Sequence, residues 1–315
     1  MADSLCEHEV EEFSAKLSFE HNLKLPKGIA SSMEGNIIVA DIMKGKVFDS
    51  NGDLLYSLCL PIDDELLYDT VDVDTDNNGN VYLLVWIANE DHAQPSKKHW
   101  YEVFVFDKDG TLQSKFPLRA ESRGRKLAVF TQNDSTEILV LEGGDGSLAM
   151  VEVYRSDGSF VGQFGEGDLT DAQDIVTNNK GHIYVLDKSD ESQGKCVHEF
   201  SADGTPLRSF RVDPNSIAIA YDRAHEHIVI ASSRYDPEKI GFHQNVSIYD
   251  GSDAIPNSKL LRSYCLDSVR ILLDVSITVN TEGLIAVVLA QDFNGEPRGK
   301  LIVMEETTKG LLALH

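Results

Sequence analysis

Short runs of apolar and β-branched residues recur along the whole chain, separated by polar turns. In one unit, residues 28–30 read Gly-Ile-Ala, residues 34–36 Glu-Gly-Asn and residues 37–41 Ile-Ile-Val-Ala-Asp. Apolar runs of this length between turn residues are typical of buried β-strands, and helical periodicity is nearly absent. The pattern therefore predicts an all-β protein.

The same succession of run and turn occurs six times. Its copies contain the turns at Gly35, Gly79, Gly181 and Gly283 and the runs Glu137–Val140 and His227–Ala231, which lack the turn glycine. A second turn follows in most copies, at Asn51-Gly52, Asp109-Gly110, Asp157-Gly158 and Asp203-Gly204, with Asp250-Gly251 a looser fifth. These dipeptides favour two-residue hairpins in which both central residues have positive φ.

Each unit is thus expected to form four short antiparallel strands. A spacing of about 50 residues is that of one β-propeller blade, so the fold class predicted is an all-β, six-bladed β-propeller of four-stranded antiparallel blades. A β-sandwich would explain the strands, but not two turns that recur in register six times.

Residues 25–30, 35–41 and 47–49 resemble an NHL repeat. The resemblance extends from about residue 14 onward and implies a six-bladed NHL propeller, similar to the C-terminal domain of tripartite-motif NHL proteins. It divides the chain into an acidic N-terminal lead, residues 1–13, and a single propeller, residues 14–315. No RING, B-box or coiled coil precedes the repeats, so ubiquitin-ligase activity is not implied. RNA-binding members of the family use a basic face, which this chain lacks.

A propeller has an exposed strand edge unless the two ends of the chain interlock. Residues 14–19 are expected to form an outer strand that joins the last blade and stabilises the ring. Residues 311–314, after Gly310, could fill the same place.

Charge and cysteine content narrow the choice of partners. With 28 basic and 52 acidic residues the net charge is −24, which disfavours binding to nucleic acid. The four cysteines are scattered, and neither a secretory signal nor a membrane-length apolar run is present. A cytoplasmic monomer without a membrane partner is expected.

Propeller topology sorts the connections onto two faces. In each blade, the turn between the two inner strands and the turn between the two outer strands are short, and they share one face, which we call the short-loop face. The connections between these strand pairs and between blades are longer and share the other face, which we call the long-loop face. Binding residues are expected on the long-loop face. Trp86 and Trp100 are the first candidates there; they could form an aromatic platform for a ligand or could simply close the edge of a blade. Arg123 and Arg125, in the basic segment 115–126, could bind an anion or could belong to a solvated loop.

Acidic residues near the starts of inner strands are the second group of candidates. Asp72, Asp174 and Asp274 lie in alternate copies and are expected to converge on the axis. They could bind a ligand or a hard divalent cation such as Ca²⁺, or could bond backbone amides and water. His225 and His227 have metal-binding spacing but fall at a turn, so a zinc site is not expected.

Two functions remain open. The first is a protein- or peptide-binding module that uses the long-loop face, without a cofactor. The second is an enzyme of hydrolase or lyase type that binds a small molecule, with or without a metal, at the mouth of the channel. No catalytic motif identifies its residues, and metal analysis of the purified protein would separate the two.

Overall fold

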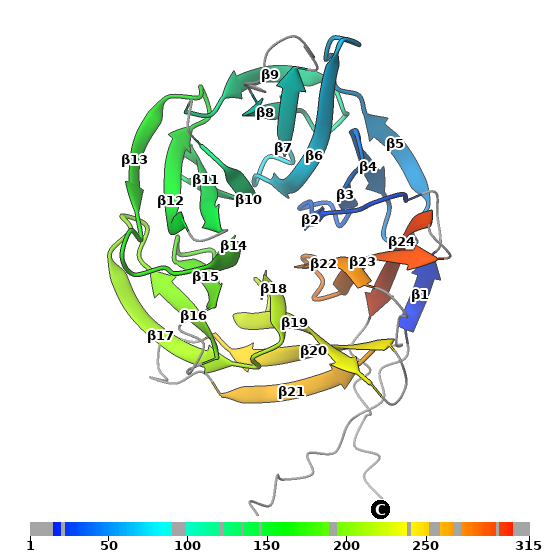
Figure 1. Cartoon of the computed structure of the whole chain (residues 1–315), viewed down its shortest axis with the longest axis vertical. Helices are drawn as coiled ribbons and strands as arrows, with labels where there is room; N and C mark the ends of the chain where they lie inside the picture. Colours follow the sequence, from blue (N-terminus) through cyan, green and yellow to red (C-terminus); the bar gives the residue numbers. More distant parts are fainter. Residues whose placement is uncertain are drawn as a thin grey trace, which may run out of the picture.

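The computed structural model of the chain is a ring of six β-sheets around a central axis (Figure 1). The structure describes residues 15–19, 23–89, 99–119, 122–133, 135–144, 147–188, 194–237, 241–251, 259–266, 272–293 and 296–304. Each sheet has four antiparallel strands, as the repeats predict, and the fold class is an all-β, six-bladed propeller.

The blades follow one another in chain order, and the strands of each run from the axis outward. Blades 1 to 3 comprise β2 (Gly28–Ser31), β3 (Ile37–Asp41), β4 (Lys44–Phe48), β5 (Leu54–Leu58); β6 (Leu66–Thr75), β7 (Val81–Asn89), β8 (His99–Phe106), β9 (Leu112–Pro117); and β10 (Gly124–Gln132), β11 (Ser135–Gly144), β12 (Ser147–Arg155), β13 (Phe160–Phe164). Blades 4 to 6 comprise β14 (Ala172–Thr177), β15 (Ile183–Lys188), β16 (Lys195–Phe200), β17 (Pro206–Val212); β18 (Ser216–Asp222), β19 (His227–Asp236), β20 (Gly241–Asp250), β21 (Leu260–Cys265); and β22 (Leu272–Val279), β23 (Ile285–Phe293), β24 (Glu296–Met304), β1 (Ala15–Phe19).

The first strand of the chain closes the ring. β1 pairs antiparallel with β24 as the outer strand of blade 6, with Phe19 opposite Leu301 (Figure 1). This confirms that the N-terminal segment joins the last blade. The alternative segment, residues 311–314, lies outside the described residues.

Burial explains the difference between inner and outer strands. Second strands such as β3 and β15 are buried almost throughout, because a neighbouring blade covers each face of the sheet. Outer strands such as β5 and β13 are exposed or half-buried over most of their length. Instead of one central core, the described residues form six apolar clusters, and each lies between two adjacent blades. Their burial provides the main driving force for ring closure.

The hairpin turns differ from the prediction. Gly52 has φ 84°, but Asn51 is not among the residues with positive φ, and Gly52 N–H donates to the Asp49 carbonyl at 2.9 Å. The turn is therefore a type I turn with glycine at its last position, followed by a bulge in the outer strand pair. The dipeptide located the hairpin correctly, but the expected pair of positive φ angles was wrong. Asn133 and Glu226 adopt positive φ where the third and fifth copies lack a turn glycine.

The connections on the long-loop face are shorter than expected in several blades. β19 extends to Asp236 and β20 begins at Gly241, while only residues 294–295 separate β23 from β24. Much of the predicted loop sequence is therefore β-hairpin that projects from the ring. Residues 90–98 lie outside the described residues.

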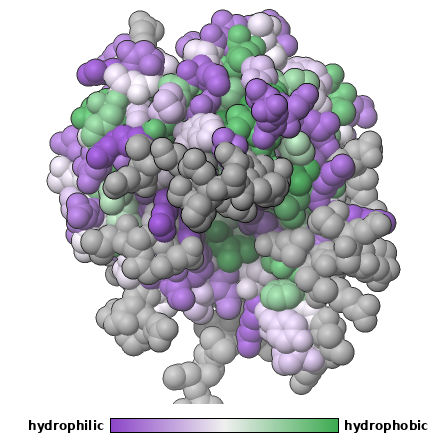
Figure 2. All heavy atoms as spheres, turned by 45° about the horizontal axis from the view of Figure 1, so that its top comes forward, coloured by the Kyte–Doolittle hydropathy of each residue, from purple (hydrophilic) through white to green (hydrophobic). Residues whose placement is uncertain are grey.

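The visible face in Figure 2 is mainly hydrophilic, with hydrophobic side chains in patches between polar ones. Exposed apolar residues of the outer strands include Leu54, Phe160 and Leu260. No helix in the described part of the chain is long and apolar enough to cross a membrane.

Candidate functional site

The inner strands bring three of the predicted aspartates towards the axis. Asp72 lies on β6 and Asp174 on β14, and both residues are buried; Asp274 lies on β22 and is partly exposed. They surround a cation that the sequence placed in a loop. Lys126 belongs to β10, and its side chain is only 14 % exposed.

Lys126 reaches across the axis to blades on the far side. Its ammonium group donates to the Lys27 carbonyl at 2.9 Å and to Ser276 Oγ at 3.1 Å, and it lies 3.6 Å from Asp72 Oδ1. Ser276 also donates to the Lys27 carbonyl, at 2.9 Å. One lysine of blade 3 thus joins the inner strands of blades 6 and 2 and the residue that precedes the inner strand of blade 1.

The charged groups of this cluster influence one another's pKa values. Burial disfavours the charged form of Lys126, but the carboxylates of Asp72, Asp174 and Asp274 outweigh burial and raise its pKa. Burial raises the pKa of Asp72 to about 7, and the nearby Lys126 opposes the rise. Burial also raises the pKa of Asp174 and of Asp274, again against the attraction of Lys126. One ammonium group therefore compensates three carboxyl groups only in part.

The aspartates also join blades through the main chain. Asp72 Oδ2 accepts the Leu127 N–H at 2.8 Å, and Asp174 Oδ2 accepts the Ile219 N–H at 2.9 Å. In each case the acceptor lies on one inner strand and the donor on the next. A Cβ atom at Gly28 would lie 2.1 Å from Asp72 Oδ1, so the glycine of blade 1 makes room for the carboxylate.

This donor set does not fit a hard divalent cation. Ca²⁺ takes six to eight oxygen ligands, whereas here an ammonium group and main-chain amides already engage the carboxylates. Within the described ranges, no group of three or more His, Cys, Asp or Glu side chains is arranged to hold a metal ion. Both oxygens of Asp72 have a partner, which also leaves little scope for that carboxyl to act as a general acid.

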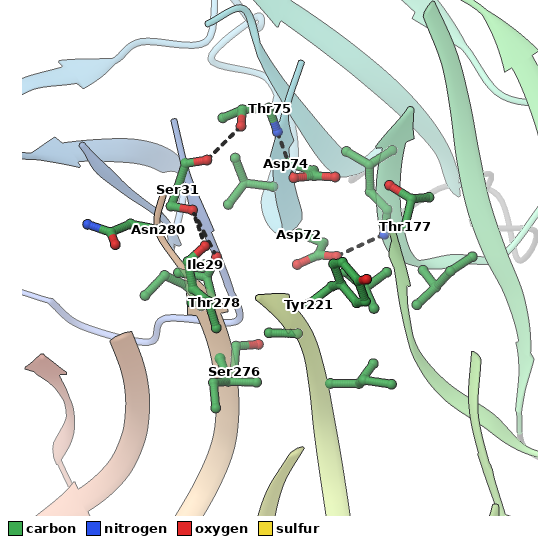
Figure 3. A pocket seen from close by; sticks show the side chains of 18 of the residues that line it. Ile29, Ser31, Asp72, Asp74, Thr75, Thr177, Tyr221, Ser276, Thr278 and Asn280 are labelled. Atoms are coloured by element: carbon green, nitrogen blue, oxygen red, sulfur yellow. Dashed lines mark hydrogen bonds between the residues drawn. The ribbon is translucent and has the colours of Figure 1, made fainter. Parts of the chain in front are cut away.

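Lys126 separates two cavities. One is a narrow channel of about 80 Å³, whose lining extends from Asp72 and Asp174 to Met33 and Thr281 on the short-loop face. Figure 3 shows Asp72, Asp74, Ser31, Thr278 and Tyr221 around this space. The other is a depression of about 460 Å³ on the long-loop side. Lys126 lines both cavities, so its side chain forms part of the partition between them.

The long-loop depression combines aromatic and charged side chains. Trp86 and Tyr101 face each other on β7 and β8, and Arg125 lies on the neighbouring blade. Lys27 and Asp69 form an ion pair at 2.5 Å within the same lining, and Asp274 contributes from blade 6. Asp69 Oδ1 is buried and has no hydrogen-bond partner among the described residues. The depression therefore combines two aromatic rings with charged side chains of both signs.

The structure brings some of the predicted site residues together and separates others. Trp86, Arg125 and Asp274 share the depression, while Asp72 and Asp174 line the channel beyond Lys126. Trp100 packs on the apolar cluster between blades 1 and 2, and its indole N–H donates to Glu102 at 3.0 Å. It therefore lies on the opposite face of the blade from Trp86. Arg123 is exposed and contributes to the electrostatic environment of Tyr101.

The basic segment 115–126 is not one patch. Lys115 pairs with Glu102 at 2.9 Å, Arg119 with Glu152 at 3.1 Å, and Arg125 lies 3.9 Å from Asp171. Each of these cations thus meets a different acidic partner, as expected if the segment offsets nearby acids. His225 and His227 lie at the turn predicted for them, where His225 Nδ1 is 2.7 Å from Asp222.

Two important side chains do not stand out in the sequence. Lys126 resembles the loop cations around it, and Arg223 lies near a turn of the short-loop face. The alternation of residues along a strand could have separated Trp86 and Tyr101 from Trp100, had the pairing register of β7 and β8 been known.

Neither a family model nor a curated protein sequence matches this chain. Solved structures do resemble it. A chain in the crystal structure of the mitotic checkpoint complex has a TM-score of 0.53 and 11% identity, covering 97% of this chain and 96% of that chain. The gluconolactonase XC5397 from Xanthomonas campestris has a TM-score of 0.53 and 11% identity, covering 90% and 87%.

The PQQ-bound aldose sugar dehydrogenase from Streptomyces coelicolor is also similar, with a TM-score of 0.50 and 12% identity over 92% of this chain and 99% of that chain. At this level of identity the likeness supports the propeller fold alone, because one fold hosts many functions. The function has to be argued from the two cavities.

Proposed function

We propose that the protein is an intracellular, NHL-type propeller that binds a protein or peptide segment through its long-loop face. The observation that carries this proposal is the depression between blades 1, 2 and 3, in which Trp86 and Tyr101 adjoin Arg125 and the Lys27–Asp69 ion pair. Aromatic residues and arginine are the side chains most enriched at protein-binding hot spots.

The chemistry of the depression suggests the kind of segment. Trp86 and Tyr101 offer apolar ring surface to an aromatic or aliphatic side chain. Arg125 and Lys27 favour a carboxylate beside it. A short acidic segment with one large apolar residue meets both requirements. The local charge of the depression thus differs from the acidic character of the whole chain.

The hydrolase or lyase alternative receives less support. Its proposed carboxylates are engaged by Lys126 and by main-chain amides, and an axial metal would have to displace the lysine. We therefore favour a non-catalytic module, acting as a monomer, over an enzyme at the channel mouth.

Selection of a random peptide library on the immobilised full-length protein tests the proposal. Selected peptides should contain an apolar residue next to an acidic one. Their dissociation constants, measured by fluorescence anisotropy, should rise about tenfold or more in Trp86→Ala and in Arg125→Gln.

Arg155→Gln provides a matched control, because Arg155 is exposed at the far end of β12. It should leave the dissociation constants unchanged. The proposal fails if no peptide is selected, or if the selected peptides bind Trp86→Ala and Arg125→Gln as tightly as the unmodified protein.

A further inference from the structure

The channel on the short-loop side of Lys126 has no role in the proposed peptide binding. Its lining changes character with depth: Asp72, Asp174 and Lys126 lie at the inner end, and Met33, Arg223 and Thr281 lie at the mouth. Outside this mouth is a wider basin of about 430 Å³, which Arg223 also lines. The channel is therefore a polar pocket that opens away from the long-loop face.

Hydroxyl groups on the channel wall hold the blades together. Thr75 donates to the Ser31 carbonyl at 2.8 Å, Ser31 to the Val279 carbonyl at 2.8 Å, and Thr177 to the Val129 carbonyl at 3.2 Å. Each bond runs from one inner strand to that of the preceding blade. The walls are thereby fixed, and a ligand would find the pocket already formed.

Two charged side chains of opposite sign lie at different depths of this pocket. Asp74 is within the channel, where Oδ2 accepts the Val129 N–H at 2.6 Å and Oδ1 accepts the Thr75 N–H at 2.8 Å. Each carboxylate oxygen keeps a second lone pair. Arg223 is at the junction of channel and basin, where it donates to Asn77 at 3.2 Å. Among the described residues its other four N–H groups have no hydrogen-bond partner, so they remain for a ligand.

Asp74 and Arg223 attract each other without forming an ion pair in the described structure. The space between them is therefore lined by a negative group on the inner side and a positive group on the outer side. A simple anion would meet the aspartates inside, and a simple cation would have to pass Arg223. A ligand that carries both charges satisfies both ends.

We propose that this pocket binds a small zwitterion, such as an amino acid, with its ammonium group towards Asp74 and its carboxylate towards Arg223. Arginine binds a carboxylate through two parallel hydrogen bonds, whereas a carboxylate accepts from an ammonium group. Burial raises the pKa of Asp74 to about 6, so a nearby ammonium group would also relieve the cost of the buried charge.

Isothermal titration calorimetry with amino acids of increasing length tests this inference. Glycine, β-alanine, 4-aminobutyrate and 5-aminopentanoate vary the distance between the two charges, and butylamine and butyrate each carry only one. One of the amino acids should bind about tenfold or more tighter than both single-charge compounds, because it gains a second charge-assisted hydrogen-bonded contact. The inference is wrong if none binds more tightly than both.

Two variants assign the ends of the bound molecule. Arg223→Gln should reduce the affinity of the best amino acid to that of butylamine, and Asp74→Asn should reduce it to that of butyrate. Arg155→Gln and Asp157→Asn, both exposed, are the matched controls and should bind as the unmodified protein does. If Asp74→Asn does not fold, Arg223→Gln still tests the inference, because Arg223 is partly exposed. Unchanged affinity of the best amino acid for Arg223→Gln contradicts the inference. None of these substitutions is in the long-loop depression, so their results do not depend on whether the protein binds a peptide there.

Discussion

The two ends of the propeller axis use similar side chains in different ways. On the long-loop side, Trp86 and Tyr101 border an open depression whose lining includes the Lys27–Asp69 ion pair. In the channel beyond Lys126, one oxygen of Asp72 lies near Lys126 and the other accepts the Leu127 N–H. Both regions contain acids, but only in the first do Trp86 and Tyr101 lie together beside them.

This difference separates structural carboxylates from those available to a ligand. An aspartate near the axis does not indicate a metal site when a neighbouring inner strand supplies a lysine and a main-chain N–H. Here the lysine and the aspartates of the inner ring connect inner strands from blade to blade. The groups that can bind a ligand are Trp86 and Tyr101 on one side and Arg223 on the other.

Both cavities depend on a closed ring, so removal of the closing strand should have the largest effect. Deletion of residues 1–20 removes β1 and leaves the edge of β24 unpaired. We expect this deletion to lower the melting temperature, measured by circular dichroism, more than any of the single substitutions does. Deletion of residues 1–13, which keeps β1, is the control and should change little. Equal melting temperatures for both deletions would show that β1 does not stabilise the ring.

The next largest effect should come from the lysine that divides the cavities. Lys126→Met removes the ammonium group but leaves the carboxyl groups of Asp72 and Asp174 buried. Loss of one partner of a buried ion pair costs about 3–5 kcal/mol. Chemical denaturation should therefore show a decrease of this order in the free energy of unfolding.

Lys115→Met is the matched control, because Lys115 pairs with Glu102 at the surface. Removal of such a pair costs about 0–1 kcal/mol. If the two methionine variants lose equal stability, Lys126 is not an internal counter-ion of the aspartates.

A smaller effect should appear as a pH dependence. The pKa of Asp72 is raised from 3.8 in the unfolded chain to about 7 in the folded one, so the folded state retains its proton over this range. The contribution of Asp72 to stability therefore decreases as the pH rises from about 4 to about 7, by up to about 4 kcal/mol. Relative to Asp72→Asn, the unmodified protein should be less stable at pH 8 than at pH 5. A difference between the two that does not change with pH would contradict the raised pKa.

Much of this fold was predictable because its signals are local. Turn glycines such as Gly35 and Gly79 recur in register, and segment 15–19, in which apolar and polar residues alternate, precedes the first blade. The convergence of Asp72 and Asp174 followed from the same register. These features need no knowledge of contacts between blades.

The site was less predictable because it depends on pairing between strands. Blade 3 turns at Asn133 rather than at a glycine, so the register of its inner strand was not evident and Lys126 was assigned to a loop. Likewise, Trp86 is opposite Tyr101 and Ile87 is opposite Trp100, which puts the two tryptophans on different faces of the blade. A shift of one residue in either strand pair would reverse these assignments.

The central claim is that Lys126 compensates the buried aspartates and closes the channel between the two cavities. Carbon-13 NMR titration of the Asp72 carboxyl group, identified from its absence in Asp72→Asn, tests it most directly. We predict a pKa of about 7 in the unmodified protein and a higher one in Lys126→Met, where the compensating charge is gone. A pKa near 3.8, or one that is the same in both proteins, would contradict the claim.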